Sequence, residues 1–290
     1  IVGLSIAREL KKRFRQAKII ILEKEDRIGL HSSGRNSGVI HSGIYYPADS
    51  LKAKICKQGA IEMSDYHHDN RLPINDIGKI LVTLNDYDIP QLETLHERAK
   101  LNGVKAEIID TNQLREIEPE AHSVCGKSLY VPSTKVGDPG NTIIQLGKEI
   151  ESHGIKILHQ AYHIDFNVKE KKVLINNKEK IHYGHIINTA GFNADKIAHQ
   201  YNIGKEYVII PFRGKYWRVD ESFSKKINHL IYPVPDLRMP FLGIHTTTLV
   251  DQTCYLGPTA FPAFGRANYK GLEGIQAFEA MKIAKDIFNL

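Results

Sequence analysis

The opening segment of the chain distributes its apolar residues first as in a helix and then as in a buried strand. Between Gly3 and Phe14, small and apolar residues recur at helical spacing with charged residues between them, which predicts an amphipathic helix. The run AKIIIL (17–22) then ends at Glu23 and is typical of a strand buried on both faces of a parallel sheet. A glycine at a helix start followed by helix, strand and acid is the second half of a dinucleotide-binding unit, in which Glu23 would accept hydrogen bonds from a ribose.

Helix and strand patterns continue through the next hundred residues. A helix is expected over 50–68, with Ser50 as its cap and Leu51, Ile55 and Met63 toward a core. Residues 75–85 predict one strand or a strand pair. A helix over 89–103 is expected to end at Gly103. Residues 104–119 read as a strand followed by a helix, which is capped by Asp110 or Thr111 and stops before Pro119.

The second half of the chain begins with a strand, a turn and a helix over 128–154, followed by short strands. Residues 185–188, with Ile186 and Ile187 at their centre, predict a strand that ends at the small-residue corner Thr189, Ala190 and Gly191, before a helix over 192–201. This corner suits a ligand pyrophosphate or adenine, but a plain turn would have the same composition. Segments 207–219, 229–248 and 253–269 are rich in β-forming residues and predict an antiparallel sheet, and an amphipathic helix is expected over 272–290.

Composition narrows the class of protein. The chain has 290 residues, 42% of them hydrophobic and 25% charged, which is enough material for two domains with cores. The net charge of +6 is spread along the chain, so we expect attraction to anionic substrates or peripheral contact with anionic lipid, and no nucleic-acid partner. Three distant cysteines and scattered histidines do not have the spacing of a disulfide framework or a metal site.

A second glycine-rich stretch, HSSGRNSGVIHSGIYY (31–46), follows the predicted nucleotide-binding unit. Glycines, serines and an asparagine alternate in it around one cation, Arg35. Such a loop can bring backbone N–H and hydroxyl groups close to a ligand, although a polar surface loop has a similar composition. A unit that binds only a nicotinamide dinucleotide does not need this second loop.

Together these segments resemble a known family. The motifs IVGLSIARELKK, LEKE, SSGRNSGVIHSGIYYPADSLKAKIC, NTAGFNAD, PFRGKYW, HLIYPVPDLRMPFLGIHTT and GPTAFPAFGR occur in the order of the FAD-dependent L-2-hydroxyglutarate dehydrogenase/oxidase family, within the D-amino-acid-oxidase-like flavoproteins. The resemblance implies a mixed α/β and α+β fold, with a Rossmann-like FAD-binding domain that has a parallel sheet, and an antiparallel β-rich substrate domain. We assign 1–70 and 125–205 to the FAD domain and 71–124 and 206–290 to the substrate domain.

The resemblance also assigns roles to residues. FAD would be held by the first helix, the strand end, the glycine-rich loop, the backbone of residue 163 and the small-residue corner: Gly3, Glu23, Lys24, Ser33, Gly34, Arg35, Asn36, Ser37, Gly38, His163, Thr189, Ala190 and Gly191. The implied reaction oxidises L-2-hydroxyglutarate, or a similar 2-hydroxydicarboxylate, to 2-oxoglutarate by hydride transfer to flavin N5. His41 would be the base, with His245 as its rival. Arg213, Tyr216 and Arg238 would bind the two carboxylates.

Several alternatives stay open at this level. A flavoprotein of the same class could oxidise an amino acid, sarcosine or glycerol 3-phosphate. The family's first strand, leading glycines and C-terminal portion have no counterpart in these residues, so we expect a fragment that retains FAD poorly, and an inactive truncated remnant is a further alternative. The electron acceptor could be oxygen, a quinone or a carrier protein. The expected location is cytoplasmic or peripheral on the inner membrane of a bacterium, or mitochondrial in a eukaryote.

Overall fold

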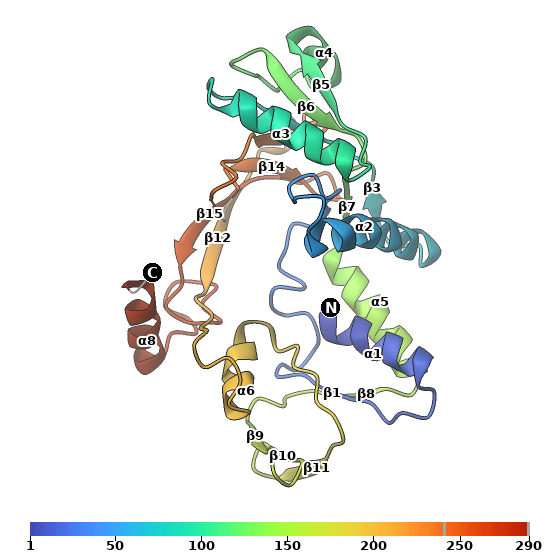
Figure 1. Cartoon of the computed structure of the whole chain (residues 1–290), viewed down its shortest axis with the longest axis vertical. Helices are drawn as coiled ribbons and strands as arrows, with labels where there is room; N and C mark the ends of the chain where they lie inside the picture. The colour runs from blue at the N-terminus through green and yellow to red at the C-terminus, as the bar shows by residue number, and fades with distance from the viewer. Residues whose placement is uncertain (240–241, 289–290) are drawn as a thin grey trace. The chain divides into compact units, whose positions relative to one another are not determined.

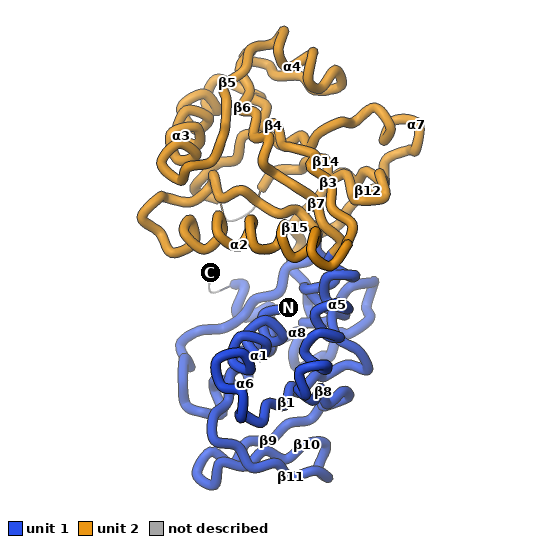
Figure 2. The backbone as a smooth tube through the Cα atoms, turned by 90° about the vertical axis from the view of Figure 1, so that its right-hand side faces the viewer, with its two compact units in different colours: residues 1–36, 139–213, 262–290 blue, residues 37–138, 214–261 orange. Residues whose placement is uncertain are grey.

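The chain forms two compact units, each assembled from segments that are far apart in the sequence (Figure 2). The structure, a computed structural model, describes residues 1–239 and 242–288. Unit 1 contains residues 1–36, 139–213 and 262–290, and unit 2 contains residues 37–138 and 214–261. Which of the two predicted domains holds a cofactor and which a substrate stays a prediction. Residues 240–241 and 289–290, within the predicted sheet segment and the last helix, lie outside the described residues.

Unit 1 combines helices with short strands (Figure 1). Its elements are α1 (Val2–Arg13), β1 (Ile20–Leu22), α5 (Pro139–Ser152), β8 (Lys156–Leu158), β9 (Ile164–Asn167), β10 (Lys172–Ile175), β11 (Glu179–His182), the 3-10 helix η1 (Gly191–Asn193), α6 (Ala194–Gln200) and α8 (Ala277–Phe288). Helix α1 leads into β1, and α5 leads into β8. The two strands pair in parallel, and the two helices pack against each other. Strands β9, β10 and β11 form an antiparallel sheet of their own, with the order β11-β10-β9.

Two local expectations for unit 1 are corrected. Within the described residues β1 pairs with β8 alone, and its residue Ile20 is exposed, so β1 is not buried on both faces. Residues 185–188 are not a strand, because they make no ladder hydrogen bonds, although the turn and the helix after them form as η1 and α6. The composition of these segments was apolar enough for buried strands, but pairing depends on neighbours that composition does not specify.

Unit 2 is built around a sheet with helices on both faces. Its elements are β2 (Val39–Ile40), α2 (Leu51–Asp69), β3 (Ile74–Asn75), β4 (Lys79–Val82), α3 (Asp88–Leu101), β5 (Glu107–Asp110), α4 (Thr111–Ile117), β6 (Lys127–Val131), β7 (Lys135–Gly137), α7 (Glu221–Ser224), β13 (Leu230–Pro233), β14 (His245–Thr248) and most of β12 (Phe212–Arg218) and β15 (Cys254–Pro262). The strand order is β13-β4-β6-β5, with β13 and β4 parallel and the other pairs antiparallel. Two further three-stranded sheets have the orders β2-β7-β3 and β12-β15-β14.

The central strand β4 is buried along its whole length because both faces of its sheet are covered. Successive side chains of a strand point to opposite faces. Leu81 accordingly packs in a core with Leu92 and Leu95 of α3, whereas Ile80 packs in a second core with Leu114 of α4. Lys79, two residues before Leu81, belongs to the same face as Leu81 and is fully buried there.

In unit 2 the helix caps predicted from the sequence are present, but the buried face predicted for α2 is not. The Ser50 side chain caps α2 by accepting a hydrogen bond from the Ala53 N–H. Asp110 caps α4 in a reciprocal box with Gln113. In contrast, Leu51 is 70% exposed and Ile55 is 59% exposed, so the expected apolar face of α2 is wrong. The α2 helix instead buries Ala53, Ser64 and His67, a face with little apolar signal in the sequence.

The predicted fold class is confirmed. Parallel pairing occurs in β1–β8 and β13–β4, and antiparallel pairing dominates elsewhere, which gives the mixed α/β and α+β architecture. Within residues 1–239 and 242–288, no helix has both the length and the apolar composition needed to span a bilayer.

Candidate functional site

In unit 1 the N-terminus of α1 meets two of the segments predicted to hold a cofactor. The backbone nitrogen of Ile1 lies 2.9 Å from Ser33 Oγ. A Cβ atom at Gly3 would lie 2.7 Å from Thr189 Oγ1, so only glycine permits this approach. The helix has no side-chain cap and no acidic residue in its first turn. Three predicted cofactor residues, Gly3, Ser33 and Thr189, are therefore together at a positive helix end.

The loop from residue 31 to residue 36 folds back on itself. Gly34 N–H and Arg35 N–H both donate to the carbonyl oxygen of His31, each at 3.0 Å. The Asn36 amide donates to the carbonyl oxygen of Ser33 at 2.8 Å. Arg35 donates through Nε to the Leu30 carbonyl oxygen and lies over the Tyr269 ring, 4.2 Å from its centroid. The loop is thus a preformed turn with its one cation held against an aromatic ring.

The end of β1 has a group of charged side chains. Glu23 accepts a hydrogen bond from the Glu25 N–H, and Lys24 forms an ion pair with Glu25 at 2.5 Å. His31 Nε2 lies 2.6 Å from Glu25 Oε1, while its Nδ1 lies 2.8 Å from Tyr269 Oη. Lys24 and His31 lower the pKa of Glu25 by hydrogen bonding to its carboxylate. Glu25 and His31, which the sequence did not single out, therefore link the strand end to the glycine-rich loop.

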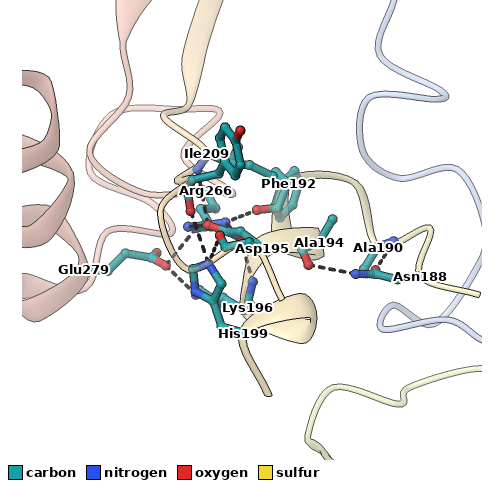
Figure 3. Close-up of polar contacts among 12 residues, drawn as sticks. Asn188, Ala190, Phe192, Ala194, Asp195, Lys196, His199, Ile209, Arg266 and Glu279 are labelled. Carbon is teal, nitrogen blue, oxygen red and sulfur yellow. Dashed lines mark hydrogen bonds and ion pairs between the residues drawn. The ribbon is translucent and has the colours of Figure 1, made fainter. Parts of the chain in front are cut away.

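The small-residue corner is held by polar contacts, of which those of Asn188 are exposed and those of Arg266 are largely buried (Figure 3). Asn188 donates to the Ala194 carbonyl oxygen at 2.8 Å and accepts from the Ala190 N–H at 3.3 Å. Arg266 donates to the Phe192 carbonyl oxygen and to both carboxylate oxygens of Asp195. The segment containing Thr189, Ala190 and Gly191 is therefore fixed from both ends.

His163 is placed less favourably for its predicted role. Its N–H donates to Asn176 Oδ1 at 3.0 Å, and its carbonyl oxygen accepts from the Asn176 N–H at 2.8 Å. The carbonyl oxygen retains a second lone pair for an adenine donor, but the N–H is already used. The assignment of His163 to adenine stays a prediction that now depends on its carbonyl group.

The residues gathered in unit 1 fit the nucleotide part of FAD. A diphosphate requires N–H donors at an uncapped helix N-terminus and a close approach without a side chain, which α1 and Gly3 provide. A ribose hydroxyl requires a carboxylate at the strand end, and Glu23 occupies that position. The individual contacts to FAD stay predictions.

In unit 2 the predicted base His41 follows β2 directly. Gly38, at a φ of 71°, leads into this strand, and its carbonyl oxygen accepts from the Gly137 N–H. Cys56 of α2 donates to the His41 carbonyl oxygen at 3.4 Å. The Asn102 side chain, at the end of α3, donates to the carbonyl oxygens of Gly43 and Tyr46. The backbone that carries His41 is therefore held by two helices and a strand, within three residues of the predicted cofactor residue Gly38.

A compact group of aromatic, imidazole and amine side chains surrounds His41. Its ring packs edge-on against Tyr45, with centroids 6.2 Å apart. Lys79 Nζ donates to Tyr45 Oη at 3.1 Å and lies 5.3 Å from the centroid of the Tyr232 ring. The His245 ring stacks on Tyr232, with centroids 3.8 Å apart and planes 16° apart. The structure thus brings both predicted catalytic histidines into one group in unit 2, which also contains Lys79, Tyr45 and Tyr232.

Burial and the lysine keep both imidazoles neutral. Burial lowers the pKa of His41 to about 3, with further contributions from nearby Lys79 and His245. Burial also lowers the pKa of His245, against the opposite effect of its 2.7 Å hydrogen bond to the Gly243 carbonyl oxygen. Because a carbonyl can only accept, the proton of neutral His245 is on Nδ1. In the described residues His41 Nδ1 is buried without a hydrogen-bond partner, as expected where a ligand supplies one.

The three residues predicted to bind substrate have different surroundings. Tyr216 lies in unit 2 and packs edge-on against Tyr255. Its Cα lies beside Gly257 of β15, and Gly257 pairs with His245 of β14. Arg213 belongs to unit 1, where it donates to Asn268 Oδ1 at 3.4 Å. Arg238 is 88% exposed and forms a two-pronged ion pair with Asp236. Only Tyr216 is therefore connected to the His41 group within one unit, and the substrate-binding assignments stay predictions.

Lys79 is the main residue of this group to which the sequence motifs assigned no role. The signal was present in the sequence, because Lys79 is the single charged residue in GKILV, a strand that is otherwise apolar. Buried lysines are rare unless they are paired. Tyr45 lies inside the glycine-rich stretch but had no assigned role, and Tyr232 is distant from it in sequence.

Comparison with known sequences agrees with these observations. Residues 1–288 match the DAO family, described as FAD dependent oxidoreductase. L-2-hydroxyglutarate dehydrogenase of Escherichia coli K12 is 34% identical over 272 residues, which cover 93% of this chain and 64% of the relative. The mitochondrial L-2-hydroxyglutarate dehydrogenase of Nematostella vectensis is 36% identical over 289 residues, covering 94% of this chain and 63% of the relative. The chain spans less than two thirds of the length of these curated relatives.

Solved structures show the same fold. Reduced L-alpha-glycerophosphate oxidase from Mycoplasma pneumoniae with FAD bound has a TM-score of 0.77 at 24% identity, covering 98% of this chain and 75% of that one. Glycine oxidase from Geobacillus kaustophilus has a TM-score of 0.75 at 14% identity, covering 99% and 75%. At these identities the likeness supports the fold alone. The family match confirms the resemblance inferred from the sequence, including FAD as the cofactor of the family: the chain belongs to the DAO family of FAD dependent oxidoreductases.

Proposed function

We propose that the protein oxidises L-2-hydroxyglutarate, or a similar 2-hydroxydicarboxylate, to the corresponding 2-oxo acid with FAD as the oxidant. The named function of the relatives that match over more than nine tenths of this chain supports the substrate. The observation that carries the chemistry is the neutral imidazole of His41, whose Nδ1 atom is buried and has no partner among the described residues.

The cofactor would be held by residues of the uncapped helix end and the glycine-rich loop. Gly3, Ser33 and Thr189 meet at the N-terminus of α1, and Glu23 is placed at the end of β1. Ser37 and Gly38 continue the same loop toward His41. When bound, FAD supplies the two-electron oxidant that takes the hydrogen from C2 of the substrate with its electron pair.

His41 would perform the proton transfer. Oxidation of an alcohol breaks the C2–H bond and the O–H bond and forms a C=O bond, so the hydroxyl proton needs an acceptor. A histidine with a pKa of about 3 is unprotonated throughout the neutral range, and its free ring nitrogen is the proposed acceptor. Because such a group holds a proton weakly, this role requires a negative charge of the bound substrate beside it. His245 is the less suitable base because its ring is held by Tyr232 and by the Gly243 carbonyl oxygen.

We propose that one tyrosine hydroxyl group and two guanidinium groups bind the two carboxylates of the substrate. Tyr216 is the predicted donor connected to His245 through the β12-β15-β14 sheet. Arg213 has a buried Nε without a partner among the described residues, which is consistent with a ligand-binding guanidinium. To bind a substrate carboxylate, Arg238 would have to break its ion pair with Asp236.

The test is flavin reduction in the FAD-loaded, full-length protein. L-2-hydroxyglutarate should bleach the flavin, and D-2-hydroxyglutarate, glycerol 3-phosphate, sarcosine and proline should not. His41→Ala should slow reduction roughly 100- to 10,000-fold, the usual contribution of a general base. The matched control is His68→Ala, because His68 is an exposed histidine of α2. An undiminished rate in His41→Ala would eliminate His41 as the base, and bleaching by another substrate alone would refute the proposed function.

The second half of the cycle requires an electron acceptor, for which we propose oxygen, a quinone or a carrier protein. Oxygen consumption compared with reduction of a soluble quinone would distinguish the first two. Relatives include a bacterial and a mitochondrial protein, and the proposed location is cytoplasmic or peripheral on the inner membrane of a bacterium, or mitochondrial in a eukaryote. The net charge of +6 supports peripheral contact with anionic lipid, and binding to anionic and neutral vesicles would test this.

A further inference from the structure

Lys79 is a charged residue in an apolar setting. It begins β4, where it pairs with Leu230 of β13 and Val131 of β6, and its side chain has no exposed surface. Burying an ammonium group is costly unless other groups compensate for the lost water. The compensation visible around Lys79 is small.

The ammonium group of Lys79 has one hydrogen-bond acceptor and two aromatic faces. It donates to Tyr45 Oη at 3.1 Å and lies 4.4 Å and 5.3 Å from the centroids of the Tyr45 and Tyr232 rings. In the part of the chain that the structure describes, no carboxylate forms an ion pair with it. An ammonium has three donors, so this arrangement leaves capacity for a further acceptor.

The titratable groups that face Lys79 do not supply a negative charge. They are His41 after β2, Tyr45, Cys56 of α2, Tyr232 of β13 and His245 of β14. Burial raises the pKa values of Tyr45, Cys56 and Tyr232 and lowers those of both histidines, so all five are neutral near pH 7. The group therefore has at most one charge, and that charge is positive.

We propose that Lys79 binds a carboxylate of the substrate and is the cation that places this anion beside His41. This inference rests on the proposed function and adds a residue to it. A carboxylate at Lys79 would give the buried ammonium the partner that the protein itself does not provide. It would also offset the positive charge that His41 acquires when it takes the hydroxyl proton, which the neighbouring ammonium would otherwise oppose.

The ionisation of Lys79 makes this role measurable. Burial lowers its pKa to about 7, with a smaller opposing effect of Cys56. A carboxylate that binds the protonated form should therefore bind more weakly as the pH rises, by roughly tenfold per unit above the pKa. His41 with a pKa of about 3, and the tyrosines and Cys56 with raised pKa values, do not titrate between pH 6 and 8.5. The pKa of His245 is lowered from its ordinary 6.5, and Lys79→Arg, which keeps His245, controls for its protonation near pH 6.

The experiment uses glutarate, which has both carboxylates but no hydroxyl group to oxidise. Its affinity for the FAD-loaded, full-length protein is measured by perturbation of the flavin absorbance at pH 6 and pH 8.5, in wild type, Lys79→Arg and Lys79→Met. We expect wild type to lose at least tenfold in affinity at the higher pH. Lys79→Arg should bind glutarate at both pH values, because its charge does not titrate, and Lys79→Met should bind at least tenfold more weakly than wild type at pH 6.

The outcomes separate this inference from the proposed function. Glutarate affinity that is unchanged in Lys79→Met, or a pH dependence in wild type that persists in Lys79→Arg, would overturn the role of Lys79. The comparison of wild type with Lys79→Arg at the two pH values tests the role of Lys79 independently of Lys79→Met. Failure to oxidise L-2-hydroxyglutarate, together with lysine-dependent glutarate binding, would instead refute the proposed substrate and leave Lys79 as an anion-binding residue.

Discussion

Arg266 holds the carboxylate of Asp195 with two nitrogen atoms, at 2.5 and 2.6 Å, although the two residues are 71 positions apart in the sequence. Both side chains are almost completely buried, at 9% and 8% exposure. Burial raises the pKa of Asp195, but the hydrogen bonds from Arg266 and the Ile209 N–H outweigh it and leave the pKa below its usual value. The ion pair thus fixes the segment after β15 to the start of α6, next to the small-residue corner (Figure 3).

Breaking this pair should destabilise unit 1. Arg266→Met leaves the Asp195 carboxylate buried without its partner, and we expect a loss of about 3–5 kcal/mol in the free energy of unfolding. Arg266→Lys keeps the charge but not the planar two-pronged geometry, so it should lose less. Hydrogen exchange should show faster opening of α6 in Arg266→Met. A loss below about 1 kcal/mol would contradict the structural role of the pair.

The close approach of Gly3 to Thr189 gives a second prediction. Gly3→Ala places a methyl group 2.7 Å from Thr189 Oγ1, whereas the Thr189 Cβ atom is at an ordinary 3.6 Å. We expect overpacking to cost about 1–3 kcal/mol and to weaken FAD binding. Thermal unfolding and flavin fluorescence would measure the two effects.

A double mutant identifies the cause of that loss. Thr189→Ala removes the atom that clashes, so Gly3→Ala with Thr189→Ala should recover stability. Gly3→Ala with Thr189→Val should not, because valine retains a group of similar size. Equal behaviour of the two double mutants would show that the loss has another origin, such as the conformation of the helix start.

The exposed pair Arg238 and Asp236 gives a third prediction. An ion pair with an exposed, salt-screened partner contributes little to stability, and the Arg238 side chain is 88% exposed. We expect Arg238→Ala to change the KM for L-2-hydroxyglutarate by less than about threefold, since screened charges interact weakly with a substrate. Steady-state kinetics at low and moderate salt would measure this. A rise of tenfold or more would support the predicted role of Arg238 in substrate binding.

Local chemistry made parts of the fold predictable from sequence. The Ser50 and Asp110 caps need only residues within three positions, and both form as expected. The inward face of α2 was not predictable, because it depends on strands that are distant in the sequence. One example is β7, where the absence of a side chain at Gly137 makes room for His67. Composition alone therefore placed Leu51 on the wrong side.

In the candidate site, too, some residues could be predicted from the sequence and others could not. His41 could be found from its position after the glycine-rich loop, because only the two residues of β2 separate it from Gly38. Lys79 could not be assigned to the same group, since Tyr45 and Tyr232, which contact it, come from a loop and from β13. The pairing of β4 with β13 places Leu230 opposite Lys79 and Tyr232 opposite Leu81, so that Tyr232 lies on the same face of the sheet as Lys79.

The buried amine of Lys79 should make stability depend on pH in the alkaline range. In the folded protein burial lowers the pKa of Lys79 to about 7, whereas in the unfolded chain it has the ordinary value of 10.5. Between these values the unfolded state binds more protons, so the free energy of unfolding should rise with pH, by at most about 1.4 kcal/mol per unit. Below pH 7 the amine is charged in both states, and its destabilising effect is constant.

Lys79→Met separates this effect from other titrating groups. Methionine has a similar length but no charge, so the variant should be more stable than wild type at pH 7, and the difference should shrink as the pH rises toward 10. Urea unfolding followed by circular dichroism at pH 7, 8 and 9 would measure it. Lys79→Arg is the opposite control, because a buried guanidinium keeps its charge and should gain nothing from alkaline pH. If wild type and Lys79→Met kept a constant difference over this range, Lys79 would not be losing its proton near pH 7, and its ammonium would need a compensating partner that the described residues do not contain.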